Sequence, residues 1–412
     1  MEINIHLSKT KYFVCLLLSV AAAMLLYELI CCDTFIGYID GYYTYKYLPD
    51  FFIEGYWDYY VKFPMGTAIC EAPFFFVAHT IMSIYDPVNA IGTGGAYEYA
   101  IGICGIFYFC IGFSFLYVTL KRIYSGSTAF FTCLCLMLGT PIVYYGTKYA
   151  SFSHIYSFAA AAVFLYLAVI IDDSRHETLT SFFMGLLAGL LFLIRNINVF
   201  FVLSYVLIDF GTKDRFGSHI KKVLSHKRLP ANISGGVIAI MLQLLHWHRV
   251  LGTWLPNTYS DESFIYWNEP KLIQVWFSDA KGYFIFAPMM VISVIGFYFM
   301  VKNEGRRYLA SALSMFAFES YITAAWWCWW MGGVYSIRSF LDITAFMALP
   351  MGAFFTWLLP EAERSRPVRV FYTVILLIFV YINFALMRGA EAGIINETMA
   401  SWWQLRESLL LR

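Results

Sequence analysis

The sequence carries little charge. Lysine, arginine, aspartate and glutamate make up 13% of its 412 residues, whereas soluble domains carry roughly 25%. Basic and acidic residues nearly balance, at 28 against 27, so no basic surplus indicates a nucleic-acid partner. Low charge, a 60% hydrophobic content and a mean hydropathy of +0.64 together predict an all-α integral membrane protein.

Metal-binding and processing motifs are also missing. The 9 cysteines form no C-x-x-C pair and no Cys/His spacing of a zinc site. No small-residue cleavage site follows the apolar N-terminal segment, so we interpret it as a transmembrane helix that stays in place. We find no internal repeat, linker or separate soluble domain. Residues 1–388 are therefore expected to form one transmembrane domain, and residues 389–412 a short amphipathic tail on the outer surface.

Apolar runs of about 20 residues, the length that crosses a bilayer, recur along the chain. One run, Met65–Ile84, is interrupted by Glu71, Pro73 and His79, and its placement decides the topology. If it lies in the outer interface, more than half of the 28 basic residues gather inside, as the positive-inside rule expects. We therefore predict a bundle of about eleven transmembrane helices with the N-terminus inside. The predicted spans are Tyr12–Ile30, Ala100–Leu120, Ala129–Tyr145, Ile155–Ile171, Phe182–Ile194, Val199–Phe210, Ile233–Val250, Tyr283–Val301, Leu309–Trp327, Phe340–Leu359 and Val370–Met387.

The first outer loop, residues 32–99, is long, aromatic and charged, and juxtamembrane helices are expected in it. Most connections between helices are only a few residues long, so this length favours an active-site loop at the membrane surface. An interfacial segment without chemistry is the alternative, because tyrosine and tryptophan prefer the headgroup layer. The charged residues and the neighbouring tyrosines are Asp40, Tyr42, Tyr43, Lys46, Asp50, Asp58 and Lys62.

Further candidates lie at the outer ends of later helices. Arg195 falls in I-R-N-I-N, between two predicted half-length spans, where an arginine is costly. It either holds an anion or extends to the lipid headgroups. Arg338 follows two glycines and precedes a span, which suits a donor at the mouth of a site. Lys281 is either a site residue or a helix-entry residue, and His154 ends the S-F-S-H segment.

Taken in order, the motifs resemble those of the polyprenyl-phosphate-sugar-dependent membrane glycosyltransferases of the GT-C fold. Bacterial members related to the lipid A aminoarabinose transferase and the protein O-mannosyltransferases are the most similar. The series covers most of the chain: D-G-Y-Y-T-Y-K-Y-L-P, K-F-P-M-G with A-P-F-F-F-V-A-H, G-T-P-I-V-Y-Y-G with S-H-I-Y-S-F, G-L-L-A-G-L-L-F-L-I-R-N-I-N, F-S-D-A-K-G-Y-F-I-F-A-P and W-W-M-G-G-V-Y-S-I-R-S-F-L-D.

The resemblance implies an inverting transfer of a sugar from a polyprenyl-phosphate donor to a hydroxyl or amine of a glycan, lipid or protein. Asp40 matches the family's general base, and Lys62 and Arg195 match the residues that hold the donor phosphate. We add Arg338 to the phosphate-binding group. Secondary candidates are Tyr42, Tyr43, His154 and Lys281. S-F-S-H stands where the family has an acidic residue, so no cofactor is assigned and a divalent metal stays open.

Elementary chemistry asks for the same groups. Displacing a phosphate from a sugar needs a base for the incoming hydroxyl and fixed positive charge where the phosphate gathers negative charge. The sequence thus predicts a glycosyltransferase of the bacterial inner membrane whose site faces outside. A flippase of lipid-linked sugars, or an O-antigen-type polymerase or ligase, is the alternative. The gathering of ionisable residues on one face, beside Asp40, favours the transferase over both.

Overall fold

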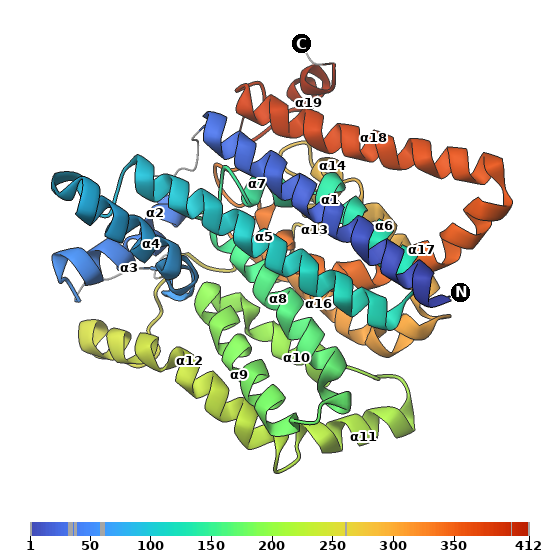
Figure 1. Ribbon diagram of the computed structural model, residues 1–412, viewed down its shortest axis with the longest axis horizontal. Helices are drawn as coiled ribbons and strands as arrows, with labels where there is room; N and C mark the ends of the chain where they lie inside the picture. The colour runs from blue at the N-terminus through green and yellow to red at the C-terminus, as the bar shows by residue number, and fades with distance from the viewer. Residues whose placement is uncertain are drawn as a thin grey trace.

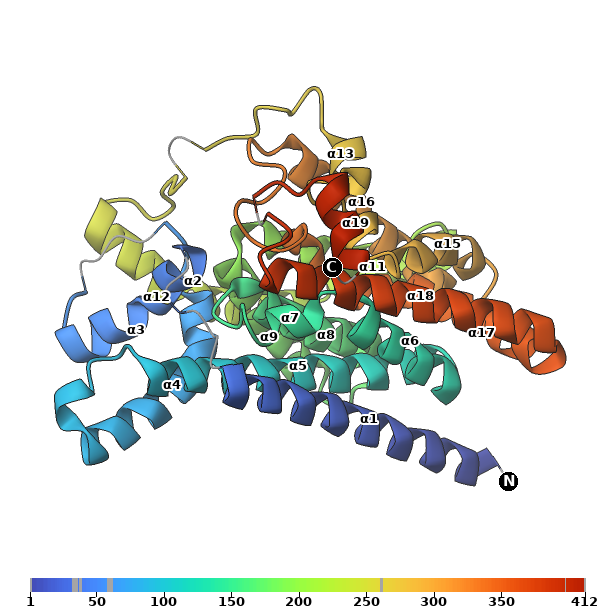
Figure 2. The same cartoon turned by 90° about the horizontal axis from the view of Figure 1, so that it is seen from above.

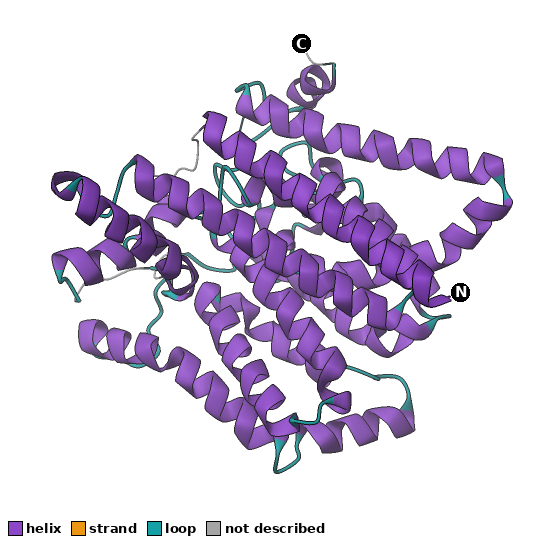
Figure 3. Ribbon diagram, in the orientation of Figure 1, coloured by secondary structure: helices purple, strands orange, loops and turns teal. Residues whose placement is uncertain are grey.

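The computed structural model describes residues 2–31, 36, 39–57, 62–259, 262–396 and 398–410. Every regular element in these ranges is helical, as Figures 1 and 3 show, which confirms the predicted all-α class. Asp58 of the first outer loop lies outside the described residues.

Eight helices of the described residues are long and apolar enough to cross a membrane. They lie in α1 (Glu2–Cys31), α4 (Gly66–Tyr85), α5 (Gly95–Ile123), α8 (Ser153–Ile170, continued by η3, Ile171–Asp173), α9 (Glu177–Ile194), α12 (Arg228–Leu251), α17 (Thr344–Arg364) and α18 (Arg366–Glu391). α4 is one of the eight by length and composition. Its placement in the outer interface stays a prediction.

Shorter helices complete the chain. In the first outer loop these are α2 (Ile39–Tyr45), α3 (Tyr47–Pro49), η1 (Asp50–Glu54) and η2 (Pro87–Asn89). Further along come α6 (Gly126–Gly139), α7 (Ile142–Tyr145), η4 (Asn196–Phe200), α10 (Phe201–Val206), α11 (Lys213–Val223), α13 (Leu272–Phe277), α14 (Tyr283–Phe286), α15 (Met290–Met300), η5 (Glu304–Tyr308), α16 (Leu309–Ala325), η6 (Arg338–Leu341) and α19 (Trp402–Leu409).

Two predicted spans are interrupted at prolines. The run Ala129–Tyr145 is not one helix, because α6 ends at Gly139 and Thr140 is extended before Pro141. The run Tyr283–Val301 is likewise split into α14 and α15 at Ala287, which precedes Pro288. A proline ring clashes with a helical conformation of the residue before it, and this local effect overrode the apolar pattern.

Of the two half-length spans predicted around I-R-N-I-N, the first is longer than predicted. α9 begins at Glu177 and has 18 residues, long enough to be a candidate span, whereas η4 and α10 together form a shorter apolar helix, Asn196–Val206. The polar start of α9 hid its length from a search for apolar runs. Arg195 therefore lies at the end of a complete span instead of in the middle of a broken one.

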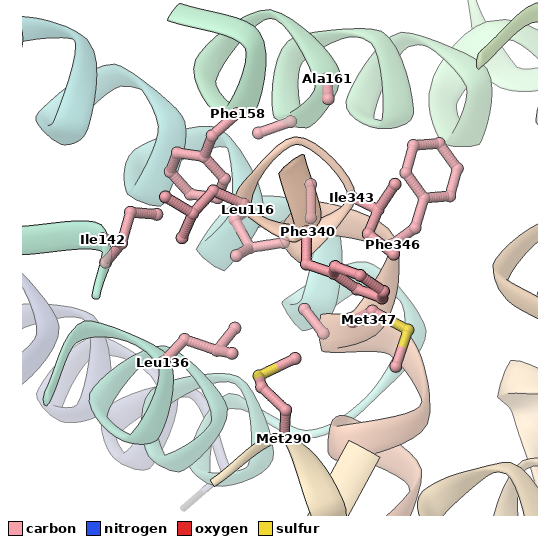
Figure 4. Packing of buried hydrophobic residues seen from close by; sticks show 14 of the residues in the cluster. Leu116, Leu136, Ile142, Phe158, Ala161, Met290, Phe340, Ile343, Phe346 and Met347 are labelled. Atoms are coloured by element: carbon pink, nitrogen blue, oxygen red, sulfur yellow. The ribbon is translucent and has the colours of Figure 1, made fainter. Parts of the chain in front are cut away.

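The core lies between helices that are distant in the sequence. Leu116, Leu136, Phe158, Met290 and Phe346 come from five different helices, are almost completely buried and meet in Figure 4. α1 and α5 lie side by side along the molecule, while α2, α3 and α4 gather at the end where α5 begins (Figures 1 and 2). This end of the bundle carries the site described below.

Small residues bring α9 and α12 into close contact. A Cβ atom on Gly185 would stand 1.9 Å from the backbone oxygen of Asn232, and one on Gly235 would stand 2.1 Å from that of Phe182. Such small residues let membrane helices approach closely where hydrophobic burial gives little drive. The contact fixes α9, and with it the position of Arg195 at its end.

The C-terminal tail folds back onto α18. Leu405 and Ser408 of α19 are buried, and Ser408 packs against Gly389, while Trp402 and Trp403 stay exposed. α18 itself continues to Glu391. The separation of residues 389–412 as a unit on the outer surface stays a prediction.

Candidate active site

The segment Ser151–His154 lies at the centre of the charged residues that the sequence singled out. A Cβ on Gly41, next to Asp40, would stand 2.2 Å from Ser151 Oγ, so α2 packs directly on this segment. The ring of Phe152 lies beneath the guanidinium of Arg338, with 5.1 Å from its Cζ to the ring centre. The segment therefore brings α2 and Arg338 to one place.

Asp40 and Arg338 are far apart in the sequence but form an ion pair in the structure. Asp40 lies in the first turn of α2 and is about one-third exposed, while the Arg338 side chain is mostly buried. The Nε of Arg338 is buried and has no hydrogen-bond partner among the described residues. Its NH2 donates to Asp40, and its NH1 makes no hydrogen bond within the described residues. Since a guanidinium carries five donors, Arg338 can hold Asp40 and offer NH1 to an anion.

Arg338 is held in place by a tightly fixed loop. The buried ammonium of Lys281 donates to the backbone oxygens of Gly332 and Val334, and the Tyr145 hydroxyl donates to that of Tyr335 at 2.6 Å. Ser336 adopts a φ of 60°, which is uncommon for a residue with a side chain. The structure thus gives Lys281 a role in shaping the loop that carries Arg338.

Arg195 pairs with a buried carboxylate that the sequence reading did not assign. It is the first extended residue after α9, and its Nε lies 3.2 Å from Asp342 Oδ2. The other oxygen of Asp342 lies 2.9 Å from Nδ1 of His154, in the first turn of α8. The side chains of Asp342 and His154 are each 1% exposed. Arg195 is therefore turned toward protein partners.

Lys62 belongs to the rim of the same site. It forms an ion pair with Glu262 and lies 5.0 Å from the centre of the Tyr259 ring. Tyr259 in turn interacts electrostatically with Asp40, Arg195 and Arg338. Lys62 is thus linked to the central pairs through the loop between α12 and α13.

The Tyr259 phenol is a hydrogen-bond donor at neutral pH. Burial raises its pKa to about 12, and Asp40 and Glu262 add to this rise while Arg195 and Arg338 oppose it. A phenol with that pKa stays protonated near neutrality. Tyr259 can therefore bind a ligand oxygen, but it cannot serve as the base.

Tyr42 and Tyr43 do not join the charged pairs. Both are more than a third exposed on α2, where their rings contact each other edge to face at 5.7 Å. Lys46 lies 5.8 Å from the centre of the Tyr42 ring. They lie on the same short helix as Asp40, with their rings exposed at the surface.

Sequence reasoning missed Asp342, Tyr259 and Glu262. Asp342 could have been found, because it ends R-S-F-L-D at the start of an apolar run, where a carboxylate is costly unless paired. Tyr259 and Glu262 lie in a long polar loop whose sequence gives no such signal.

Within the described residues no three His, Cys, Asp or Glu side chains converge as metal ligands. The carboxylates of the site face arginines, so we derive no step through a metal.

A comparison with known proteins agrees with the helical architecture. No family model and no curated protein matches the chain. Among solved structures, the chain is similar to the archaeal oligosaccharyltransferase AglB from Archaeoglobus fulgidus, determined in complex with an inhibitory peptide and a dolichol-phosphate. The TM-score is 0.53 at 13% identity, over 93% of this chain and 56% of that one.

This likeness defines the class of fold. The chain shares the helical membrane fold of this oligosaccharyltransferase. At this identity the likeness concerns the fold alone, and the chain spans just over half the length of the structure that it matches.

Proposed function

We propose that this protein transfers one sugar from a polyprenyl-phosphate donor to an acceptor hydroxyl or amine at the outer face of the membrane. One observation carries the proposal: Asp40, Arg195 and Arg338, from three distant segments, stand together at one end of the bundle. Both arginines are oriented by a carboxylate, and both keep donors that the described residues do not use. Such a site can bind a phosphate and also offer a base.

The reaction follows from these groups. The acceptor oxygen attacks the anomeric carbon from the side opposite the phosphate, and Asp40 takes its proton. The bond between the anomeric carbon and the phosphate oxygen breaks, and its electron pair leaves with the polyprenyl phosphate. Arg195 and Arg338 stabilise the charge that gathers there, and Lys62 joins them by exchanging Glu262 for the phosphate. The configuration at the anomeric carbon is inverted.

The cellular setting belongs to the same proposal. A polyprenyl-linked donor is confined to the bilayer, so its phosphate arrives at the level of the helix ends that carry the site. We propose that the protein lies in a bacterial inner membrane with the N-terminus in the cytoplasm and the site outside. The acceptor is a glycan, a lipid or a protein.

The test is transfer by the purified protein with a panel of polyprenyl-phosphate sugars, measured as release of polyprenyl phosphate. Asp40→Asn keeps the shape and removes the base, so turnover should fall by about 10²–10⁴-fold, the usual contribution of a positioned base. Binding of the donor should survive, because the arginines remain.

Asp50→Asn is the matched control in the same loop. Asp50 is 2% exposed and its pKa is raised by burial, with Lys46 opposing the rise, so it is not presented to a ligand. Its variant should keep near-normal turnover. Normal turnover in Asp40→Asn would show that Asp40 is not the base. Movement of an intact donor across liposomes, with no donor consumed, would favour the flippase.

A further inference from the structure

Two buried side chains, Asp342 and His154, contact Arg195 and have no role in the reaction proposed above. We infer that Asp342 and His154 are positioning residues that hold Arg195 in the orientation needed to bind a phosphate. The inference rests on the proposed function and extends it, because neither side chain is exposed enough to touch a substrate: Asp342 is 0% and His154 is 1% exposed.

Asp342 divides its two oxygens between the two neighbours. Oδ1 accepts from Nδ1 of His154 at 2.9 Å, and Oδ2 lies 3.2 Å from Nε of Arg195. The contact with Arg195 is an ion pair, since Oδ2 has no hydrogen-bond partner among the described residues. A buried carboxylate needs such a charged neighbour. Asp342 lies directly before α17, the central helix of the core, so this anchor has little freedom to move.

His154 supports the guanidinium from a second direction. The NH1 of Arg195 lies 3.2 Å from Nδ1 and 3.1 Å from Nε2 of the imidazole. Nearly equal distances to both nitrogens place NH1 over the face of the ring, where a planar guanidinium stacks well. The edge-to-face contact with Tyr145, at 5.6 Å between ring centres, fixes the plane of the imidazole.

These two supports leave one part of Arg195 available. Its Nε faces Asp342 and its NH1 covers His154, whereas its NH2 makes no hydrogen bond within the described residues. The side chain is 21% exposed. A phosphate that approaches from the outer end would meet a guanidinium that is already oriented, and pre-orientation lowers the cost of binding.

Charge alone predicts the opposite effect of Asp342. Asp40, Asp342 and Glu319 all interact electrostatically with Arg195, so negative charge is already plentiful around the guanidinium. If Asp342 acted only through its charge, its removal would strengthen the binding of an anion. If it acts by positioning, its removal weakens that binding. The sign of the change therefore separates the two roles.

The experiment measures binding of a short-chain prenyl monophosphate to the full-length protein in detergent, with the matching prenol as the control for the lipid tail. Asp342→Ala removes charge and contacts together, and affinity should fall about tenfold or more, because the guanidinium loses the carboxylate that orients it before the phosphate binds. Asp342→Asn keeps the shape and a hydrogen-bonding oxygen, so affinity should stay within roughly threefold of wild type. Equal or tighter binding in both variants would overturn the inference.

Variants of His154 provide a second, independent test, which can still be carried out if Asp342→Ala does not fold. His154→Phe keeps a flat ring under the guanidinium, whereas His154→Ala removes it, so the phenylalanine variant should bind the monophosphate more tightly than the alanine variant. Equal affinities of His154→Ala and wild type would overturn the role of His154. If wild type itself binds the monophosphate no better than the prenol, it is the proposed function that fails.

Discussion

Two arginine clusters lie at opposite ends of α9. They differ in how many nitrogens of the guanidinium already have a hydrogen-bond acceptor. At the start of the helix Arg228 donates through Nε to Glu177 at 2.5 Å, through NH2 to Asp172 at 2.9 Å and through NH1 to Tyr205 at 3.2 Å. Its side chain is 3% exposed. At the other end, Arg195 is 21% exposed and keeps NH2 available. A helix of this length separates the two by about 27 Å.

The difference separates an arginine whose contacts all lie within the fold from one that keeps a donor available. Every nitrogen of the Arg228 guanidinium has an acceptor and the side chain is almost completely buried, so this residue ties α9, α10 and α12 together and is not accessible to a ligand. Arg195 is also held through two of its nitrogens, Nε and NH1, but its NH2 has no acceptor within the described residues. A binding site needs this combination, because an arginine without any support would spend binding energy on being ordered.

The first prediction is that a thiol reagent added outside reaches one end of the bundle and does not reach the other. In a background without native cysteines, Asn257→Cys should react with a membrane-impermeant thiol reagent added outside, and Lys221→Cys should not. Both positions are exposed, so a difference reflects the side of the membrane. Reaction of both, or only of Lys221→Cys, would reverse the proposed orientation.

The second prediction separates the two arginines by function. Arg195→Lys should weaken donor binding about tenfold without changing thermal stability, since lysine cannot reproduce a planar fork toward phosphate. Arg228→Lys should leave donor binding unchanged and lower the free energy of unfolding by about 1–3 kcal/mol, because buried acceptors lose their partners.

Both variants are measured by donor binding and by thermal unfolding in the same detergent. Loss of stability in Arg195→Lys, with unchanged affinity, would make Arg195 a structural residue like Arg228. Loss of affinity in Arg228→Lys would show that the cluster at the start of α9 also reaches the site.

The third prediction concerns the contact that assembles the outer cluster. Gly41→Ala would place a methyl group 2.2 Å from Ser151 Oγ, so α2 must shift and carry Asp40 with it. Transfer should fall several-fold, and overpacking should cost about 1–3 kcal/mol of stability. Gly95→Ala is the control, because its Cβ meets nothing within 4 Å. Equal transfer rates in the two variants would show that the contact with Ser151 does not position Asp40.

Local sequence was sufficient for much of the fold. Helix class follows from apolar runs long enough to cross a membrane, and breaks at Thr140 and Ala287 could have been placed from the prolines that follow them. The candidates Asp40, Arg195 and Arg338 were identified because charge at the end of an apolar helix is costly and needs a reason. These are effects of neighbours in the chain, which a sequence displays directly.

The pairing of these charges was decided only by tertiary structure. That Asp40 meets Arg338, that Arg195 meets Asp342, and that Lys281 donates to the loop before Arg338 depends on which helix ends come together. Close glycine contacts, such as that of Gly41 with Ser151, set those distances. An ion pair between residues nearly 300 positions apart leaves no local pattern, because its stability comes from burial and geometry that exist only after the helices have packed.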